Sequence, residues 1–202
     1  MTELPALRTD EEDQSEPEQP PEQPEQVEPE EQEEQEEPEH APGRFEVPAG
    51  YKVLTGTRDG RRSVAVVVAK FNGDITSRLL ERALAELEEV GIQREAVTIV
   101  PVPGAFELPL AAIALAKTRR YACIVALGCV IRGETPHFEY VAGEAASGLQ
   151  LAAIETGVPV SFGVLTTESV DQAEARIDRA ADAVRSALEM ADIFSQLRAA
   201  TR

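Results

Sequence analysis

Four short apolar segments alternate with helical segments from Ser63 to about Leu197, and this alternation leaves few folds open to the chain. The apolar segments are residues 63–71, 97–102, 121–131 and 159–167. Each is followed by a stretch whose apolar residues recur at helical spacing. Strands that are apolar along their whole length are typical of a parallel sheet that helices cover on both faces. We therefore expect an α/β domain with a four-stranded parallel sheet between two helical layers.

Residues 1–42 differ in composition from the rest of the chain. They hold 17 of the 37 acidic residues and a single basic residue, Arg8, so most of the net charge of −18 belongs to them. Their repeats of Pro, Glu and Gln offer almost nothing apolar to bury, so the entropy cost of ordering them is not recovered. We expect a disordered acidic extension over 1–42, which either solvates the protein or recruits a basic partner, and one folded domain over 43–202.

Several classes of protein are disfavoured by what the sequence lacks. The N-terminus is acidic where an export signal is basic and apolar, and no apolar stretch approaches the ~18 residues of a membrane helix. Cys123 and Cys129 fall in one expected strand, too far apart to pair. There is no GxGxxG motif and no Walker lysine. We expect a cytoplasmic protein with reduced cysteines that binds neither a membrane nor a nucleic acid.

The carboxyl ends of the four strands are the expected location of a ligand site, because open parallel sheets bind ligands there. The sequences at these ends are AKFN (69–72), PGAFE (103–107), RGETPH (132–137) and LTTES (165–169). In the third, we expect Thr135 to cap a helix that has Pro136 at its first position. The N–H groups of such a helix start, next to Gly133, favour a phosphate or carboxylate.

His137 would then lie in the first turn of that helix, whose positive end favours the neutral imidazole. It is either a general base beside the anion or a structural hydrogen-bonding residue.

Three other strand-end residues and one helical arginine each allow two interpretations. Phe71 and Phe106 either stack on a flat heterocycle or cover the end of the sheet. Glu107 either accepts hydrogen bonds from hydroxyl groups or stabilises the start of its own helix. Arg176 either binds a phosphate or is one charge on a solvated helix face. Phe162, inside the fourth strand, is expected in the core.

Together the motifs resemble those of one enzyme family. The segments AKFN, PGAFELP, GCVIRGETPHFEYV, PVSFGVLTTESVDQAEAR and ALEMA are similar, in order and at matching intervals, to motifs of 6,7-dimethyl-8-ribityllumazine synthases. The resemblance implies a flavodoxin-like three-layer αβα domain that forms pentamers, in some members twelve of them in a 60-subunit shell. It implies condensation of 5-amino-6-(D-ribitylamino)uracil with 3,4-dihydroxy-2-butanone 4-phosphate, a transferase reaction of riboflavin biosynthesis that uses no metal or organic cofactor.

The resemblance also implies a role for each matching residue around the substrate ring and sugar. These residues are Phe71, Ala105, Phe106, Glu107, Cys129, Val130, Ile131 and Phe162. Phe71 would stack on the pyrimidine ring, and residues 129–131 would line its pocket, largely through backbone. Residues 105–107 would hold the ribityl chain, Glu107 through the hydroxyl groups. Phe162 of the neighbouring subunit would close the pocket, because the family's sites lie between subunits.

At the phosphate end, the resemblance implies that Glu134 and Thr135 present N–H groups to the phosphate. Arg176 of the neighbouring subunit would bind the same group, and His137 would transfer protons.

The chain departs from the family after Arg176. Shell-forming members carry a turn that resembles GTKAGNKG there, whereas this chain continues RIDRAADAVRSALEMA. We expect the two helices around the lost turn to merge into one, and Arg179 to replace a phosphate-binding lysine of that turn. The shell stays an open question. The alternative to an active synthase is a catalytically weakened homologue that binds flavin or lumazine as an oligomeric scaffold.

Overall fold

The structure is a computed structural model that describes residues 45–58 and 62–200. The chain divides into two units, Met1–Glu46 and Val47–Arg202, and all elements named below belong to the second. The expected disordered extension, and its boundary at residue 42, lie outside the described residues.

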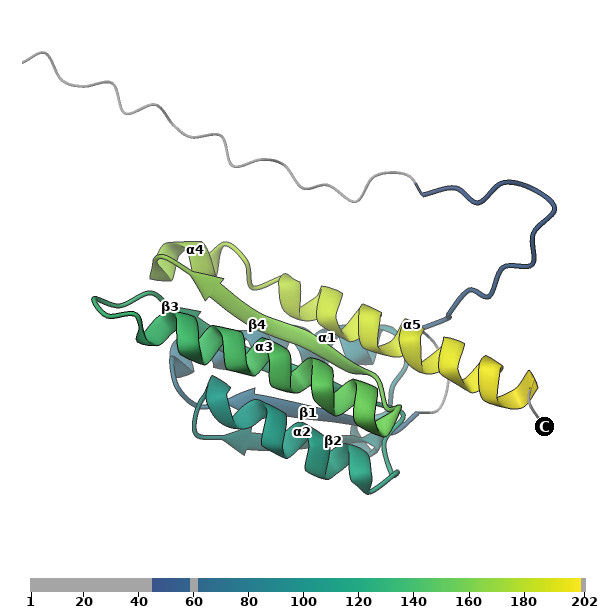
Figure 1. Ribbon diagram of the computed structural model, residues 1–202, viewed down its shortest axis with the longest axis horizontal. Coiled ribbons are helices and arrows are strands. Elements are labelled where there is room, and N and C mark those ends of the chain that lie inside the picture. Colours follow the sequence, from purple (N-terminus) through teal and green to yellow (C-terminus); the bar gives the residue numbers. More distant parts are fainter. Residues whose placement is uncertain (1–44, 59–61, 201–202) are drawn as a thin grey trace, which may run out of the picture. The chain divides into compact units, whose positions relative to one another are not determined.

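The second unit is built around a four-stranded sheet (Figure 1). Its strands are β1 (Val64–Ala69), β2 (Val97–Val102), β3 (Cys123–Ile131) and β4 (Val160–Thr167). They lie in the order β2-β1-β3-β4, and every pair is parallel. Val64 pairs with both Val97 and Cys123, so the first residues of β2, β1 and β3 lie side by side. The expected four-stranded parallel sheet is confirmed.

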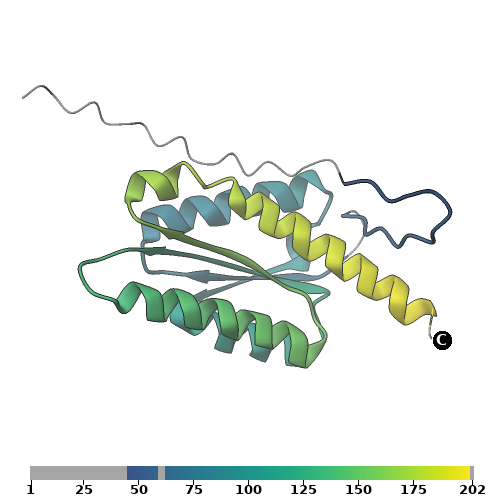
Figure 2. The ribbon, with the colours of Figure 1, turned by 45° about the horizontal axis from the view of Figure 1, so that its top comes forward.

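Helices cover both faces of this sheet, as Figure 2 shows. On one face lie α1 (Gly73–Glu89) and α5 (Arg179–Ala200), and on the other lie α2 (Leu108–Lys117) and α3 (His137–Thr156). Short elements complete the fold: η1 (Arg94–Ala96), η2 (Ala105–Glu107) and α4 (Val170–Glu174). The three-layer αβα arrangement is thus confirmed. Within the described residues, no helix is long and apolar enough to span a bilayer.

The side chains of β1 explain why its sequence is apolar without alternation. Val64, Val66 and Val68 pack in the core with α1 and α5. The other three residues of the strand pack in the opposite core with α2 and α3. All six residues are buried, because both faces of a central parallel strand are covered. Cys123 and Cys129 are both free and buried, as expected for thiols that do not pair.

One expected helix cap is wrong. The N-cap of α3 is Pro136 rather than Thr135, and no side chain bonds to that end of the helix. Helix α3 begins at His137, one residue later than a cap at Thr135 would require. The N-cap of α1 is Asn72, in the left-handed conformation.

The expected merging of the last two helices is also wrong. Ser169 caps α4, its Oγ accepting a bond from the N–H of Gln172 at 3.2 Å, and α4 ends at Glu174. The N–H groups of Arg176 and Arg179 then bond to carbonyls three residues earlier, so a turn separates α4 from α5. Bonds of this 3₁₀ type shift the spacing of side chains little over one turn. The apolar stripe in the sequence therefore passes through the turn without revealing it.

Helices α2 and α3 pack so closely that one glycine of α3 has no room for a side chain. A Cβ on Gly148 would lie 2.6 Å from Cβ of Pro109, whereas a Cβ on Gly143, in the same helix, would meet nothing within 4 Å. We expect Gly148→Ala to lower the free energy of unfolding by about 1–3 kcal/mol, because the rigid proline ring cannot move aside. Denaturant unfolding measures this.

Gly143→Ala is the matched control, because it gains the same helix propensity without the clash. It is expected to leave stability unchanged or raise it by about 0.5–1 kcal/mol. Equal stability of the two variants would contradict the close packing.

Candidate active site

A cleft of about 570 Å³ opens at the carboxyl ends of β1, β2 and β3. Its position follows from the topology. The chain leaves β1 for the α1 face and leaves β3 for the α3 face, so the two neighbouring strands diverge at their ends and leave a crevice. The residues around it are Phe71, Asn72, Gly104, Ala105, Phe106, Glu107, Cys129, Val130, Ile131, Gly133, Thr135, His137, Phe138, Tyr140 and Val141.

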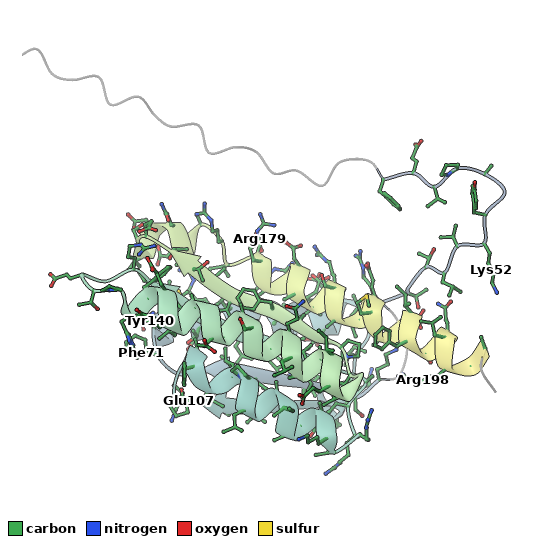
Figure 3. The ribbon with its side chains drawn as sticks, in the orientation of Figure 1. Lys52, Phe71, Glu107, Tyr140, Arg179 and Arg198 are labelled. Carbon is green, nitrogen blue, oxygen red and sulfur yellow. The ribbon has the colours of Figure 1, made fainter. Side chains whose placement is uncertain are left out.

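Three aromatic rings stand exposed around this cleft. Phe71 and Tyr140 are each 70% exposed and Phe106 is 57% exposed. Figure 3 shows Phe71 and Tyr140 at the same end of the fold as Glu107. None of these rings is buried in the core. Rings that merely covered the sheet end would be buried, so the exposure of Phe71 and Phe106 does not support that interpretation. Exposed rings beside an apolar cleft suit a flat ligand that they can stack on.

The floor of the cleft is formed by the end of β3 and the start of η2. Cys129, Val130 and Ala105 are buried there. Burial raises the pKa of the Cys129 thiol to about 11, so it stays protonated near neutral pH, which disfavours it as a nucleophile. Asn72 fixes the two strand ends to each other, because its Nδ2 donates to the Cys129 carbonyl at 3.0 Å.

Glu107 supplies the carboxylate of the cleft. It ends η2 and is the N-cap residue of α2, and its side chain is half-buried. Both carboxylate oxygens can accept hydrogen bonds, so Glu107 suits a ligand that carries hydroxyl groups.

The far end of the cleft is a helix start without a side-chain cap. The loop of residues 132–136 is exposed, and α3 begins at His137, which is also exposed. Gly133, Thr135 and His137 all line the cleft. The first N–H groups of a helix have no partner within it, and together with the helix dipole they favour an anion. This end of the cleft suits a phosphate.

Arg132 holds the two ends of that loop together. Its N–H donates to the Thr167 carbonyl at 2.9 Å, which continues the pairing of β3 with β4. Its guanidinium donates to Glu168 at 3.0 Å and to Glu139 at 3.3 Å, and lies 4.4 Å from the ring centre of Phe138. The side chain thereby joins the end of β4 to the first turn of α3, which carries His137.

Three of the twelve predicted site residues do not line this cleft. Glu134 lies in the exposed loop, Phe162 lies on the edge strand β4 with 47% of its surface exposed, and Arg176 follows α4. The prediction that Phe162 belongs to the core is wrong, because β4 has a neighbouring strand on one side only. Nη1 of Arg176 donates to the Gln172 carbonyl at 2.9 Å.

Several cleft residues were not predicted from the sequence. Asn72 closes the AKFN segment, and its left-handed conformation has no strong signal in a single sequence. Phe138, Tyr140 and Val141 follow His137 in the first turns of α3. Tyr140 and Val141 come three and four residues after His137. In a helix this spacing places them on the same face as His137, and it is the signal that could have identified them.

Comparison with known proteins identifies the family. Residues 61–195 match the model of the family described as 6,7-dimethyl-8-ribityllumazine synthase. The chain is 48% identical over 141 residues to the 6,7-dimethyl-8-ribityllumazine synthase of Yersinia pestis (strain Pestoides F), an alignment that covers 67% of this chain and 90% of the relative. The enzyme of Yersinia pseudotuberculosis serotype O:1b (strain IP 31758) matches with the same identity and coverage. The chain belongs to the 6,7-dimethyl-8-ribityllumazine synthase family.

Proposed function

We propose that this protein makes 6,7-dimethyl-8-ribityllumazine from 5-amino-6-(D-ribitylamino)uracil and 3,4-dihydroxy-2-butanone 4-phosphate, releasing phosphate and water. The observation that carries the proposal is a single cleft that joins exposed aromatic rings, a carboxylate and an uncapped helix start in a chain of this family. These three features match a flat ring, a polyhydroxylated chain and a phosphate. The protein is accordingly a transferase of riboflavin biosynthesis.

The substrates supply the reactive groups of this reaction. The 5-amino group of the pyrimidine condenses with the carbonyl of the butanone and water is lost, and the phosphate leaves by elimination. The ring closes when the ribitylamino nitrogen adds to the carbonyl formed by that elimination, with loss of a second water. The protein has to hold the two molecules together, neutralise the phosphate and move protons.

In the proposed arrangement, Phe71 stacks on the pyrimidine ring and Glu107 binds the ribityl hydroxyls. Residues 129–131 form the floor under the ring. The loop at Glu134 and Thr135, with the start of α3, binds the phosphate. His137, the first residue of α3, transfers protons between the two substrates.

The proposed site is completed by a second subunit of a homo-oligomer, which we take to be a pentamer. Phe162 and Arg176 do not line the cleft of their own chain, yet Phe162 exposes an aromatic ring on the free edge of β4. An exposed ring at a sheet edge is suited to a protein interface. Phe162 and Arg176 are therefore proposed to reach the cleft of the neighbouring copy.

The first prediction concerns turnover. The purified protein should form the lumazine, followed by absorbance, faster than the spontaneous reaction of the two substrates. His137→Ala should slow turnover about ten- to a hundredfold, at or below the lower end of typical acid–base contributions, because amine and carbonyl react even without a catalyst. Glu155→Gln, an exposed change near the other end of α3, is the control. No rate above background from the wild-type protein would overturn the proposed function.

The second prediction concerns the shared site. Arg176→Ala should raise the KM for the butanone phosphate. When the Arg176→Ala and His137→Ala variants are coexpressed and assayed at limiting phosphate substrate, the mixture should be more active than either variant alone. In randomly mixed rings, about a quarter of the sites would pair an intact His137 with an intact Arg176. Mixtures with no more activity than the average of the two variants would place both residues in one subunit's site.

The third prediction concerns the boundary of the catalytic domain, which we propose to be residues 43–202. The family match begins at residue 61 and the cleft is lined by residues 71–141. Removal of residues 1–42 should therefore change kcat and both KM values by less than about twofold, because such acidic, Pro-rich segments seldom contribute to a packed site. A large loss of activity in the truncated protein would show that the extension reaches the site.

A further inference from the structure

Three charged residues of α1 are spaced so that they face one side of the helix. Arg78, Arg82 and Glu86 are four residues apart, and residues at this spacing lie one above the other on a helix surface. Figure 2 shows α1 running alongside α4 and the first part of α5. The three side chains therefore meet the segment that follows β4.

Each of the three binds a different point of that segment. Nη1 of Arg78 lies 3.0 Å from Oε1 of Glu174, the last residue of α4. Nε of Arg82 lies 2.9 Å from Oδ1 of Asp178, in the turn before α5. Glu174 and Asp178 stand two residues before and two residues after Arg176, so the ion pairs hold the backbone on both sides of it.

The third contact is buried and bidentate. Glu86 accepts bonds from Nε and Nη2 of Arg185, in α5, at 2.7 and 2.8 Å, and from Nη2 of Arg82 at 3.1 Å. Its side chain is only 4% exposed. Burial raises the pKa of the Glu86 carboxyl, but the bonds and charges of Arg185 and Arg82 outweigh burial, and its pKa is lower than usual. Glu86 thus stays ionised and anchors α1 to α5.

The segment around Arg176 has little helical structure of its own to fix it. Helix α4 has five residues, and the turn after it is held by bonds between residues three apart. A helix this short is not stable without tertiary contacts. The position of Arg176 therefore depends on what α4 and the turn are tied to. Ala173 and Ile177 pack against the core, and the ion pairs tie Glu174 and Asp178 to α1.

We propose that the pairs Arg78–Glu174, Arg82–Asp178 and Glu86–Arg185, together the ion ladder, position Arg176 for the phosphate of the substrate. The inference rests on the proposed function and assigns that positioning role to residues outside the cleft. In this chain the ion ladder holds the shortened connection between α4 and α5 in place. Residues of α1 that never touch substrate thereby set the affinity for one substrate and not for the other.

The test uses the outer pair, because both of its side chains are half-exposed and the fold does not depend on them. Arg78→Glu places two like charges opposite each other. It should raise the KM for the butanone phosphate about two- to fivefold, the range that an exposed ion pair supplies. The KM for the pyrimidine and kcat should change by less than about twofold, because the cleft is untouched. The double variant Arg78→Glu/Glu174→Arg restores the attraction and should bring the KM back.

A second exposed ion pair, between η1 and α1, provides the control. Nη2 of Arg94 lies 3.1 Å from Oε2 of Glu88, and neither residue contacts the ladder. Arg94→Glu should leave both KM values unchanged. Hydrogen exchange gives a readout that is independent of activity: amides of residues 174–180 should exchange faster in Arg78→Glu and return toward the wild-type rate in the double variant.

The outcomes separate this inference from the proposed function. If the wild-type protein makes the lumazine but Arg78→Glu changes neither KM, the ion ladder does not position Arg176 and only this inference falls. If both KM values and kcat change together, or the double variant does not recover, the ladder acts on the fold as a whole and the inference is likewise overturned. If the wild-type protein makes no lumazine, the proposed function fails and the inference falls with it.

Discussion

Every residue of β1 is buried, and β3 is buried over all but its last residue, because helices pack on both sides of the two central strands. This double burial is the constraint on which the molecule depends. It requires each connection to leave the sheet on one face or the other, and it brings the ends of all four parallel strands to one edge. The cleft lies where the connections after β1 and β3 take opposite faces. The same packing that stabilises the domain therefore creates the space for a ligand.

The polar groups around the cleft are fixed by contacts between strand ends. Asn72 bonds to the carbonyl of Cys129, and Arg132 joins the start of α3 to Glu168 beyond β4. The end of the cleft at α3 therefore combines a helix start with a nearby cation whose side chain already bonds two carboxylates. A loop held at both ends loses little freedom when a ligand binds, so more of the interaction energy is available for affinity.

The connection between α4 and α5 is held by charged side chains of a neighbouring helix. Where shell-forming members of the family are expected to carry a Gly- and Lys-rich turn, this chain passes from Arg176 to α5 through a few residues held by three-residue turns. Charged side chains of α1 bind this segment on both sides of Arg176, and the buried carboxylate of Glu86 lies at the centre of the network. A buried ion pair needs several bonds to offset its desolvation, and Glu86 has three from two arginines.

The sequence by itself determined the fold class, the strands and most of the cleft. Continuous apolar runs at 64–69 and 123–131 are typical of doubly covered strands, and residues that follow parallel strands lie at one edge of the sheet. The tertiary structure alone decided the helix caps at Asn72 and Pro136, the turn between α4 and α5, and the exposure of Phe162. The physical reason is a difference in scale. Apolar periodicity reports burial averaged over several turns. Caps and turns depend on single dihedral angles, and an edge position depends on which strand is last in the sheet. Neither of these properties leaves a period in the sequence.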